Sequence, residues 1–203
     1  MSALQLAFIA ASDASLIITG VFDGPLSGGT PKIVELYSTS DLGDMTGYTV
    51  EFYFNANTTP SFTTTLSGSI TTGEYIYLTP NSAEFTTYFG GSSDFSGGSI
   101  NGDDSVVLKQ GATTIDVFGS PGTDGTGLVW DYLDGWAYRK SWTFASPTFD
   151  AGDWIFSGIN ATDNDTSNAT SSSPFPIGSY VPEPAAALLG SFGLIGLLRR
   201  RRA

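Results

Sequence analysis

The chain has 203 residues, of which 40% are hydrophobic and 13% aromatic, enough for one packed domain with appendages. It contains no cysteine and no histidine, so disulfides, thiol chemistry, Ser-His-Asp catalysis and histidine-based zinc sites are excluded. The formal net charge is −12. Because phosphate backbones repel so acidic a chain, direct binding to nucleic acid is disfavoured, whereas divalent cations are attracted.

Residues 1–13 predict a truncated or atypical export signal. Residues 3–11 form a mostly apolar run, and Ser12-Asp-Ala14 provides small residues for cleavage. No lysine or arginine precedes Lys32, so the basic segment that normally opens a signal peptide is missing. Either the start is truncated or mis-assigned, or the signal is atypical. Truncation is preferred, since residues 3–11 also suit an ordinary first segment.

Short stretches of β-branched and aromatic residues follow, separated by turn signals. Residues 48–54 alternate apolar and polar side chains with the period of two that a half-buried strand requires. By such criteria the predicted strands are residues 16–22, 32–37, 48–54, 62–66, 73–79, 104–109, 113–118, 127–130, 136–141 and 154–156. This arrangement predicts an all-β, antiparallel sandwich over residues 14–158.

One segment of the predicted sandwich has a helical pattern. Asn81 or Ser82 can cap a helix N-terminus, and Gly90 can end the helix. Phe85, Tyr88 and Phe89 have helical spacing between these two ends. We therefore expect one or two helical turns over residues 81–90.

Residues 159–180 change composition to Ser, Thr, Asn and Asp, which predicts a solvated linker. Residues 181–203 then contain three parts in order: Pro182-Glu183-Pro184, an uncharged apolar run over residues 185–198, and Arg199–Arg202. The run predicts a hydrophobic helix about 21 Å long. This is shorter than the hydrocarbon core of a bilayer, which is about 30 Å thick and needs roughly 20 helical residues to span. Arginines that flank such a run stay on the cytoplasmic side.

This order of parts resembles the PEP-CTERM sorting signal of Gram-negative bacteria. Pro182, Glu183 and Pro184 match the signal itself, and Arg199, Arg200, Arg201 and Arg202 match its cytoplasmic anchor. The resemblance implies that a membrane-embedded exosortase recognises the motif and removes the tail. Residues 185–198 would then enter the inner membrane only transiently, and the mature protein would be secreted or displayed at the cell surface.

The predicted sandwich is similar to a bacterial lamin-tail domain. The most specific matches are Pro31-Lys-Ile-Val-Glu-Leu-Tyr37 and Asn101-Gly-Asp-Asp-Ser-Val-Val-Leu108. The resemblance implies an immunoglobulin-like sandwich that serves as a non-catalytic interaction or architectural unit, often beside extracellular nucleases. Ser38 stands where related chains carry asparagine, so the turn chemistry there is expected to differ.

Asp103 and Asp104 are candidate ligands for a cation such as calcium, or candidate acid/base groups. The alternative, which we favour, is a turn in which these carboxylates accept hydrogen bonds from backbone N–H groups before the strand from Ser105. No cofactor is expected under this interpretation, and calcium is the open alternative.

Asp131 and Asp134 lie near Trp130, Tyr132 and Trp136, a combination that could form a shelf for sugar rings. The favoured alternative is a hairpin turn at residues 134–135 with Trp136 in the core.

Arg139 is expected on the opposite strand face from Trp136, where it could pair with Glu35 or Asp116. Glu35 and Lys32 should lie on opposite faces of their strand and not pair with each other.

These observations favour an exported, exosortase-processed β-sandwich that is not an enzyme and acts as a binding or structural module. Its expected partners are the exosortase during maturation and, once mature, extracellular polysaccharide or surface proteins. The alternatives are a cation-dependent extracellular hydrolase and an accessory domain of a surface nuclease.

Overall fold

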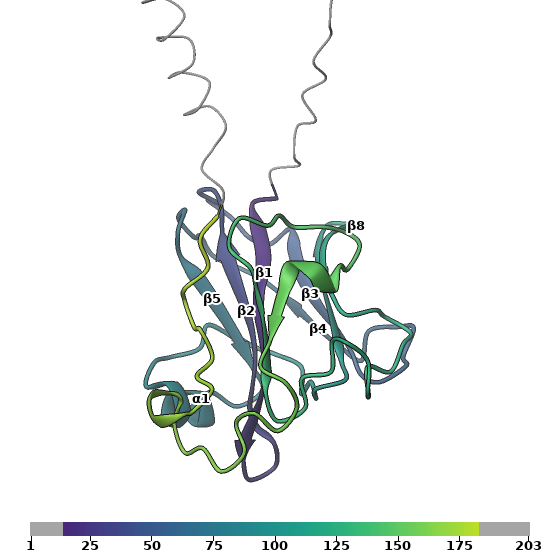
Figure 1. Cartoon of the computed structure of the whole chain (residues 1–203). Helices are drawn as coiled ribbons and strands as arrows, with labels where there is room; N and C mark the ends of the chain where they lie inside the picture. The colour runs from purple at the N-terminus through teal and green to yellow at the C-terminus, as the bar shows by residue number, and fades with distance from the viewer. Residues whose placement is uncertain (1–13, 183–203) are drawn as a thin grey trace, which may run out of the picture.

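Two β-sheets and one short α-helix make up residues 14–182, which are the residues that the computed structural model describes (Figure 1). The strands are β1 (Leu16–Leu26), β2 (Thr30–Ser38), β3 (Tyr48–Tyr53), β4 (Phe62–Thr65), β5 (Tyr75–Thr79), β6 (Phe95–Ser96), β7 (Ser105–Gln110), β8 (Thr113–Phe118), β9 (Trp136–Arg139) and β10 (Trp154–Phe156). The helix is α1 (Ser82–Phe89), and 3₁₀ turns cover Ala151–Asp153 and Asn168–Thr170. The structure thus confirms the predicted all-β architecture of two sheets with one short helix.

The larger sheet has six strands in the order β10-β9-β1-β2-β5-β6. Its pairs are antiparallel except for β5 and β6, which run parallel. A register shift between Ile18 and Gly20 interrupts the β1–β2 pairing. Because side chains alternate with a period of two, this extra residue lets Ile18 and Val21 both face the core between the sheets. Thr19, between them, faces the outer side and reaches Glu35.

The smaller sheet has four antiparallel strands in the order β4-β3-β7-β8. Tyr48, Val50 and Phe52 of β3 are buried, whereas Thr49 and Glu51 between them are half-buried, as the alternating sequence predicts. The main core lies between the two sheets. It includes Leu16, Ile18, Val34, Leu36, Ile76 and Leu78 from the larger sheet and Val50, Phe52, Val106, Leu108 and Phe118 from the smaller one.

A second core covers the outer face of the larger sheet. Ile17, Phe22, Ile33, Tyr37, Trp136 and Tyr138 of the sheet pack there against Phe85 and Tyr88 of α1 and against Phe175 and Tyr180. We call residues 168–181 the strap, because they run across this face (Figure 1). Asn81 accepts a hydrogen bond from the Glu84 N–H as N-cap of α1, and Gly90 ends the helix in the left-handed conformation, as expected.

The prediction of a solvated linker over residues 159–180 is wrong, because the strap packs into the second core. Thr162, Phe175 and Tyr180 are buried, and the side chain of Phe175 is only 1% exposed. The Trp136 indole N–H donates to the Ser173 carbonyl at 2.8 Å. A few aromatic residues therefore fix a segment whose average composition is polar, and the folded body extends to the end of the described chain, well past residue 158.

The strand predicted over residues 127–130 is also absent, and turns replace it. Gly127 has φ 72°, in the left-handed region, and its N–H donates to the Asp131 carboxylate at 2.7 Å. This conformation favours glycine and is incompatible with an extended strand. The hydrophobic helix predicted over residues 185–198 lies outside the described residues.

Both ends of the described chain lie at the same end of the larger sheet, which we call the tail pole (Figure 1). The Thr39 hydroxyl donates to the Ala14 carbonyl beside the end of β2. The rings of Tyr37 and Tyr180 are in contact there, with centroids 5.3 Å apart. The opposite end of the sandwich, which includes Asp23 and the loops around Gly102 and Asp134, is called the far pole.

Candidate functional site

The sorting motif begins where the folded body ends. Val181 donates its N–H to the Ser141 hydroxyl at 3.2 Å, and its carbonyl accepts from the Trp142 N–H at 3.0 Å. Pro182 is the last described residue. Glu183, Pro184, the run over residues 185–198 and Arg199–Arg202 lie outside the described residues. The chain is thus docked on the sandwich up to the residue before Pro182.

The carboxylate of Glu35 fastens the strap to the larger sheet. One of its oxygens accepts from the Thr19 hydroxyl and the Tyr138 hydroxyl, both at 2.7 Å. The other accepts from the backbone N–H of Gly178 in the strap, also at 2.7 Å. Glu35 is fully buried, and burial raises its pKa to about 7, while the three hydrogen bonds act in the opposite direction.

Tyr138 completes this fastening. Its hydroxyl accepts from the N–H groups of Ser179 and Tyr180, each at 3.0 Å, while it donates to Glu35. The Tyr180 hydroxyl in turn donates to the Thr143 carbonyl at 2.6 Å. Three consecutive strap N–H groups therefore bind two side chains of the sheet.

Sequence reasoning missed this role of Glu35. The available signal was its position between Ile33 and Tyr37, which share its face of β2 and are buried. A carboxylate on an apolar face needs partners, since an unpaired buried charge is costly. The expectation that Lys32 and Glu35 do not pair is confirmed, because Lys32 binds Asp23 at 2.5 Å instead.

Asp104 acts as a turn-forming residue. Its two carboxylate oxygens accept from the N–H groups of Asn55 and Asn101, each at 2.6 Å. Burial raises its pKa to about 6. Asp103 accepts from the Thr126 hydroxyl at 3.3 Å. The favoured interpretation of this pair as a structural turn agrees with these contacts.

Asp131 and Asp134 are also engaged with the backbone. The Asp131 carboxylate accepts from Gly127 and Leu133, at 2.7 and 3.1 Å. The carbonyl of Asp134 accepts from the Thr162 N–H and hydroxyl, and its own backbone has φ 45°. Burial raises the pKa of the Asp134 carboxyl, and the nearby charge of Asp163 adds to this.

The aromatic shelf proposed beside these acids is not formed. Trp130 and Tyr132 are buried in the main core, and Trp136 packs in the second core. No face of these rings is presented as a platform for a sugar. The buried position of Trp136 matches the favoured alternative. The predicted hairpin is absent, however: β9 follows a turn, but residues 127–130 before that turn are not a strand.

Arg139 pairs with Asp116 and not with Glu35. Its guanidinium contacts both carboxylate oxygens at 2.7 Å, donates to the Ile18 carbonyl at 2.6 Å and stacks on Trp154, 4.6 Å from the ring centroid. Burial raises the pKa of Asp116 to about 6, although the Arg139 charge lowers it. The pair lies between the sheets and is structural.

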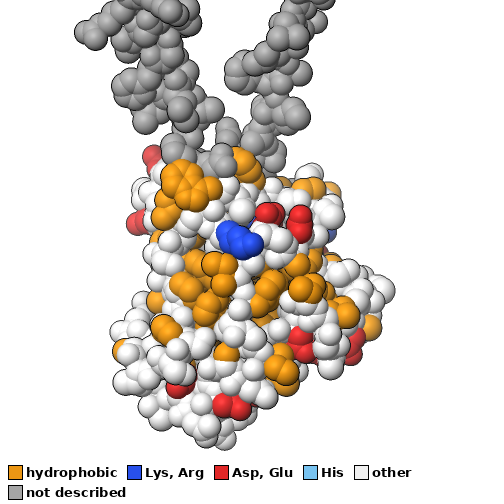
Figure 2. All heavy atoms as spheres, in the orientation of Figure 1, with side chains coloured by type: hydrophobic (Ala, Val, Ile, Leu, Met, Phe, Trp, Pro, Cys, Tyr) orange, Lys and Arg blue, Asp and Glu red, His pale blue; other side chains and the backbone are white. Residues whose placement is uncertain are grey.

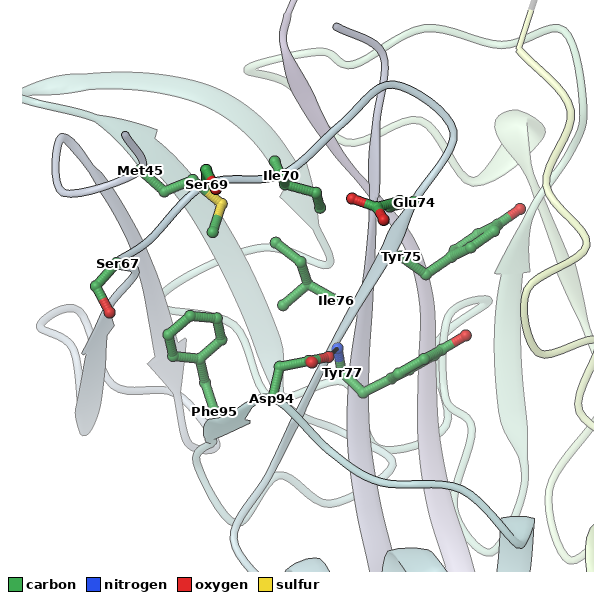
Figure 3. A pocket seen from close by; sticks show the side chains of 10 residues that line it. All are labelled: Met45, Ser67, Ser69, Ile70, Glu74, Tyr75, Ile76, Tyr77, Asp94 and Phe95. Atoms are coloured by element: carbon green, nitrogen blue, oxygen red, sulfur yellow. Dashed lines mark hydrogen bonds between the residues drawn. The ribbon is translucent and has the colours of Figure 1, made fainter. Parts of the chain in front are cut away.

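A shallow groove of about 510 Å³ lies beside β5, and Figure 3 shows its lining. Met45, Ile70, Ile76 and Phe95 form its apolar side, while Tyr75 and Tyr77 point to the other side of β5 (Figure 3). Its acidic groups, Glu74 and Asp94, accept hydrogen bonds from the backbone N–H groups of Thr71 and Tyr77, each at 2.8 Å. Each of these carboxylates thus supports the local backbone through one of its oxygens.

Across residues 14–182, no three acidic side chains converge as a metal site would require. Within the same residues, no helix has the length and apolar character to cross a bilayer.

The chain matches no protein-family model, no curated protein and no solved structure. The similarity to lamin-tail domains and to PEP-CTERM signals therefore remains a prediction from residues 31–37, 101–108 and 181–203.

Proposed function

We propose that this chain is an exported β-sandwich that an exosortase processes and that then acts as a non-catalytic binding or structural module at the cell surface or in the extracellular matrix. The observation that carries the proposal is the order of Pro182-Glu183-Pro184, the apolar run 185–198 and Arg199–Arg202. Positive charge behind a short apolar run gives the tail a defined orientation in a membrane.

The arrangement of the body supports this proposal. The strap docks through Val181, so the motif directly follows a folded surface. Both described ends lie at the tail pole, so a body held by its tail would present the far pole outward (Figure 1). An all-β body of two sheets also suits the immunoglobulin-like, lamin-tail assignment that we propose for residues 14–158.

The carboxylates support a non-catalytic role. Glu35, Asp104 and Asp116 are each buried and accept hydrogen bonds from N–H, hydroxyl or guanidinium donors. A general base needs a lone pair free for substrate, and a general acid needs a proton directed at one. Burial keeps these three carboxyl groups out of reach of a substrate.

Mass spectrometry of the protein from its native host tests the proposal. We expect mature protein that lacks Arg199–Arg202, and a Pro182→Ala/Pro184→Ala variant that keeps them and stays in the membrane fraction. Pro121→Ala changes an exposed proline outside the motif and should be processed normally. Mature extracellular protein that still ends in these arginines would refute the proposal.

A further inference from the structure

Large apolar side chains are exposed at the tail pole, next to the point where the described chain ends (Figure 2). Trp142 is 52% exposed, Phe144 48% and Val181 47%. Trp142 and Val181 are joined by a backbone hydrogen bond of 3.0 Å. Phe144 lies two residues after Trp142 in the loop that follows β9, and we call these three exposed residues the tail-pole patch.

The loop holds Trp142 outward in a costly conformation. Its φ is 72°, in the left-handed region that bulky side chains rarely adopt. Buried groups fix the loop from both sides: Arg139 donates to the Phe144 carbonyl at 2.8 Å, and Tyr180 donates to the Thr143 carbonyl at 2.6 Å. The core therefore imposes the exposed position of this indole.

Chain length limits how far this patch can lie from the apolar run. Only Pro182, Glu183 and Pro184 separate Val181 from residue 185. Even a fully extended chain covers only about 14 Å over these four steps. The headgroup layer of a bilayer is roughly 5–8 Å thick on each side of its hydrocarbon core. A run inserted in the membrane would thus hold Val181 and Trp142 at or just above the headgroups.

We infer that the tail-pole patch contacts the lipid headgroup layer while the tail is still attached. The inference rests on the proposed function, because it requires residues 185–198 to enter the membrane. Tryptophan is the side chain best suited to this layer, since its ring is apolar and its N–H is polar. The acidic protein favours zwitterionic lipid, because anionic headgroups would repel a chain whose overall net charge is −12.

Tryptophan fluorescence isolates the patch. Trp130, Trp136 and Trp154 are buried, so quenching by acrylamide in water reports mainly on Trp142, and Trp142→Phe provides the background. The full chain is reconstituted in phosphatidylcholine vesicles, with flotation to verify membrane association. We expect acrylamide quenching of the Trp142 component to fall several-fold on reconstitution, and lipids brominated near the headgroup to quench it.

The matched control moves the exposed indole to the far pole. Val129 is 71% exposed and lies three residues before Tyr132, whose N–H binds the Gly102 carbonyl at the far pole. Trp142→Phe/Val129→Trp should remain as accessible to acrylamide in vesicles as in solution. Vesicle-bound protein whose Trp142 stays fully accessible would overturn the patch inference and leave the tail proposal standing. Failure to float would overturn both. If Trp142 is protected from acrylamide only when the processing enzyme is present, the patch contacts that protein and not the lipid, and the inference is overturned.

Discussion

Phe175→Ala tests whether the strap belongs to the folded core. The ring lies between the strap and the larger sheet and is almost fully buried. It contacts the rings of four other aromatic residues, with centroid distances from 5.3 to 6.3 Å; these are Phe22, Phe89, Trp136 and Tyr138. These neighbours come from β1, β9 and the end of α1, so they cannot all close on the space that the ring leaves.

Truncating a buried phenylalanine to alanine costs about 3–5 kcal/mol, since transfer free energy is lost and a cavity remains. For a body of this size, each kcal/mol lowers the melting temperature by about 2–4 °C. We therefore expect melting to fall by about 6–20 °C. Trp136 and Tyr138 also contribute hydrogen bonds to the strap, so partial detachment should expose residues 160–181 to protease before global unfolding.

Thermal and urea unfolding followed by circular dichroism measure the loss of stability, and limited proteolysis in parallel measures the detachment of the strap. Phe144→Ala is the matched control, because the same side chain is removed from an exposed position and should cost about 0.5 kcal/mol or less. A cost for Phe175→Ala as small as that of the control, with no new cleavage in the strap, would refute the packed strap.

Two further variants test buried charges. Arg139→Ala leaves the Asp116 carboxylate buried without its cation, so urea unfolding should show a loss of about 3–5 kcal/mol, whereas Lys109→Ala breaks the more exposed pair with Glu51 and should cost about 1 kcal/mol or less. Equal losses would contradict the structural role of Arg139. Burial raises the pKa of Glu35 from 4.5 to about 7, so the folded state holds a proton that the unfolded state releases, and stability falls as pH rises through this window. Glu35→Gln should flatten this decline in urea unfolding at pH 5 and pH 7, and an unchanged slope would contradict it.

The sequence predicted most of the sheet elements, because their signals are local. Alternation in β3 and the caps of α1 at Asn81 and Gly90 act within a few residues, and the structure confirms both. The pairing of Arg139 with Asp116 was one of two predicted options, and only the three-dimensional arrangement could separate them.

The strap was missed because its anchoring depends on partners far away in the chain. Phe175 and Tyr180 are isolated aromatics in a polar segment, and composition averages such residues away. The hydrogen-bond partners of the strap on the larger sheet are Glu35, 143 residues before Gly178, and Tyr138, 42 residues before Tyr180. Likewise, the prediction of an aromatic shelf at Trp130 and Tyr132 is wrong. Exposure of these rings depends on how the loop folds over the core, which the spacing of residues in the sequence does not encode.

The meeting of Ala14 and Val181 at one pole has an evolutionary consequence. A body whose two ends are neighbours can be spliced into a surface loop of another protein, or be circularly permuted, with little disturbance to its interior. Copies strung in tandem would each need only a short connector. The same property would let this sandwich serve as an interchangeable insert in unrelated proteins.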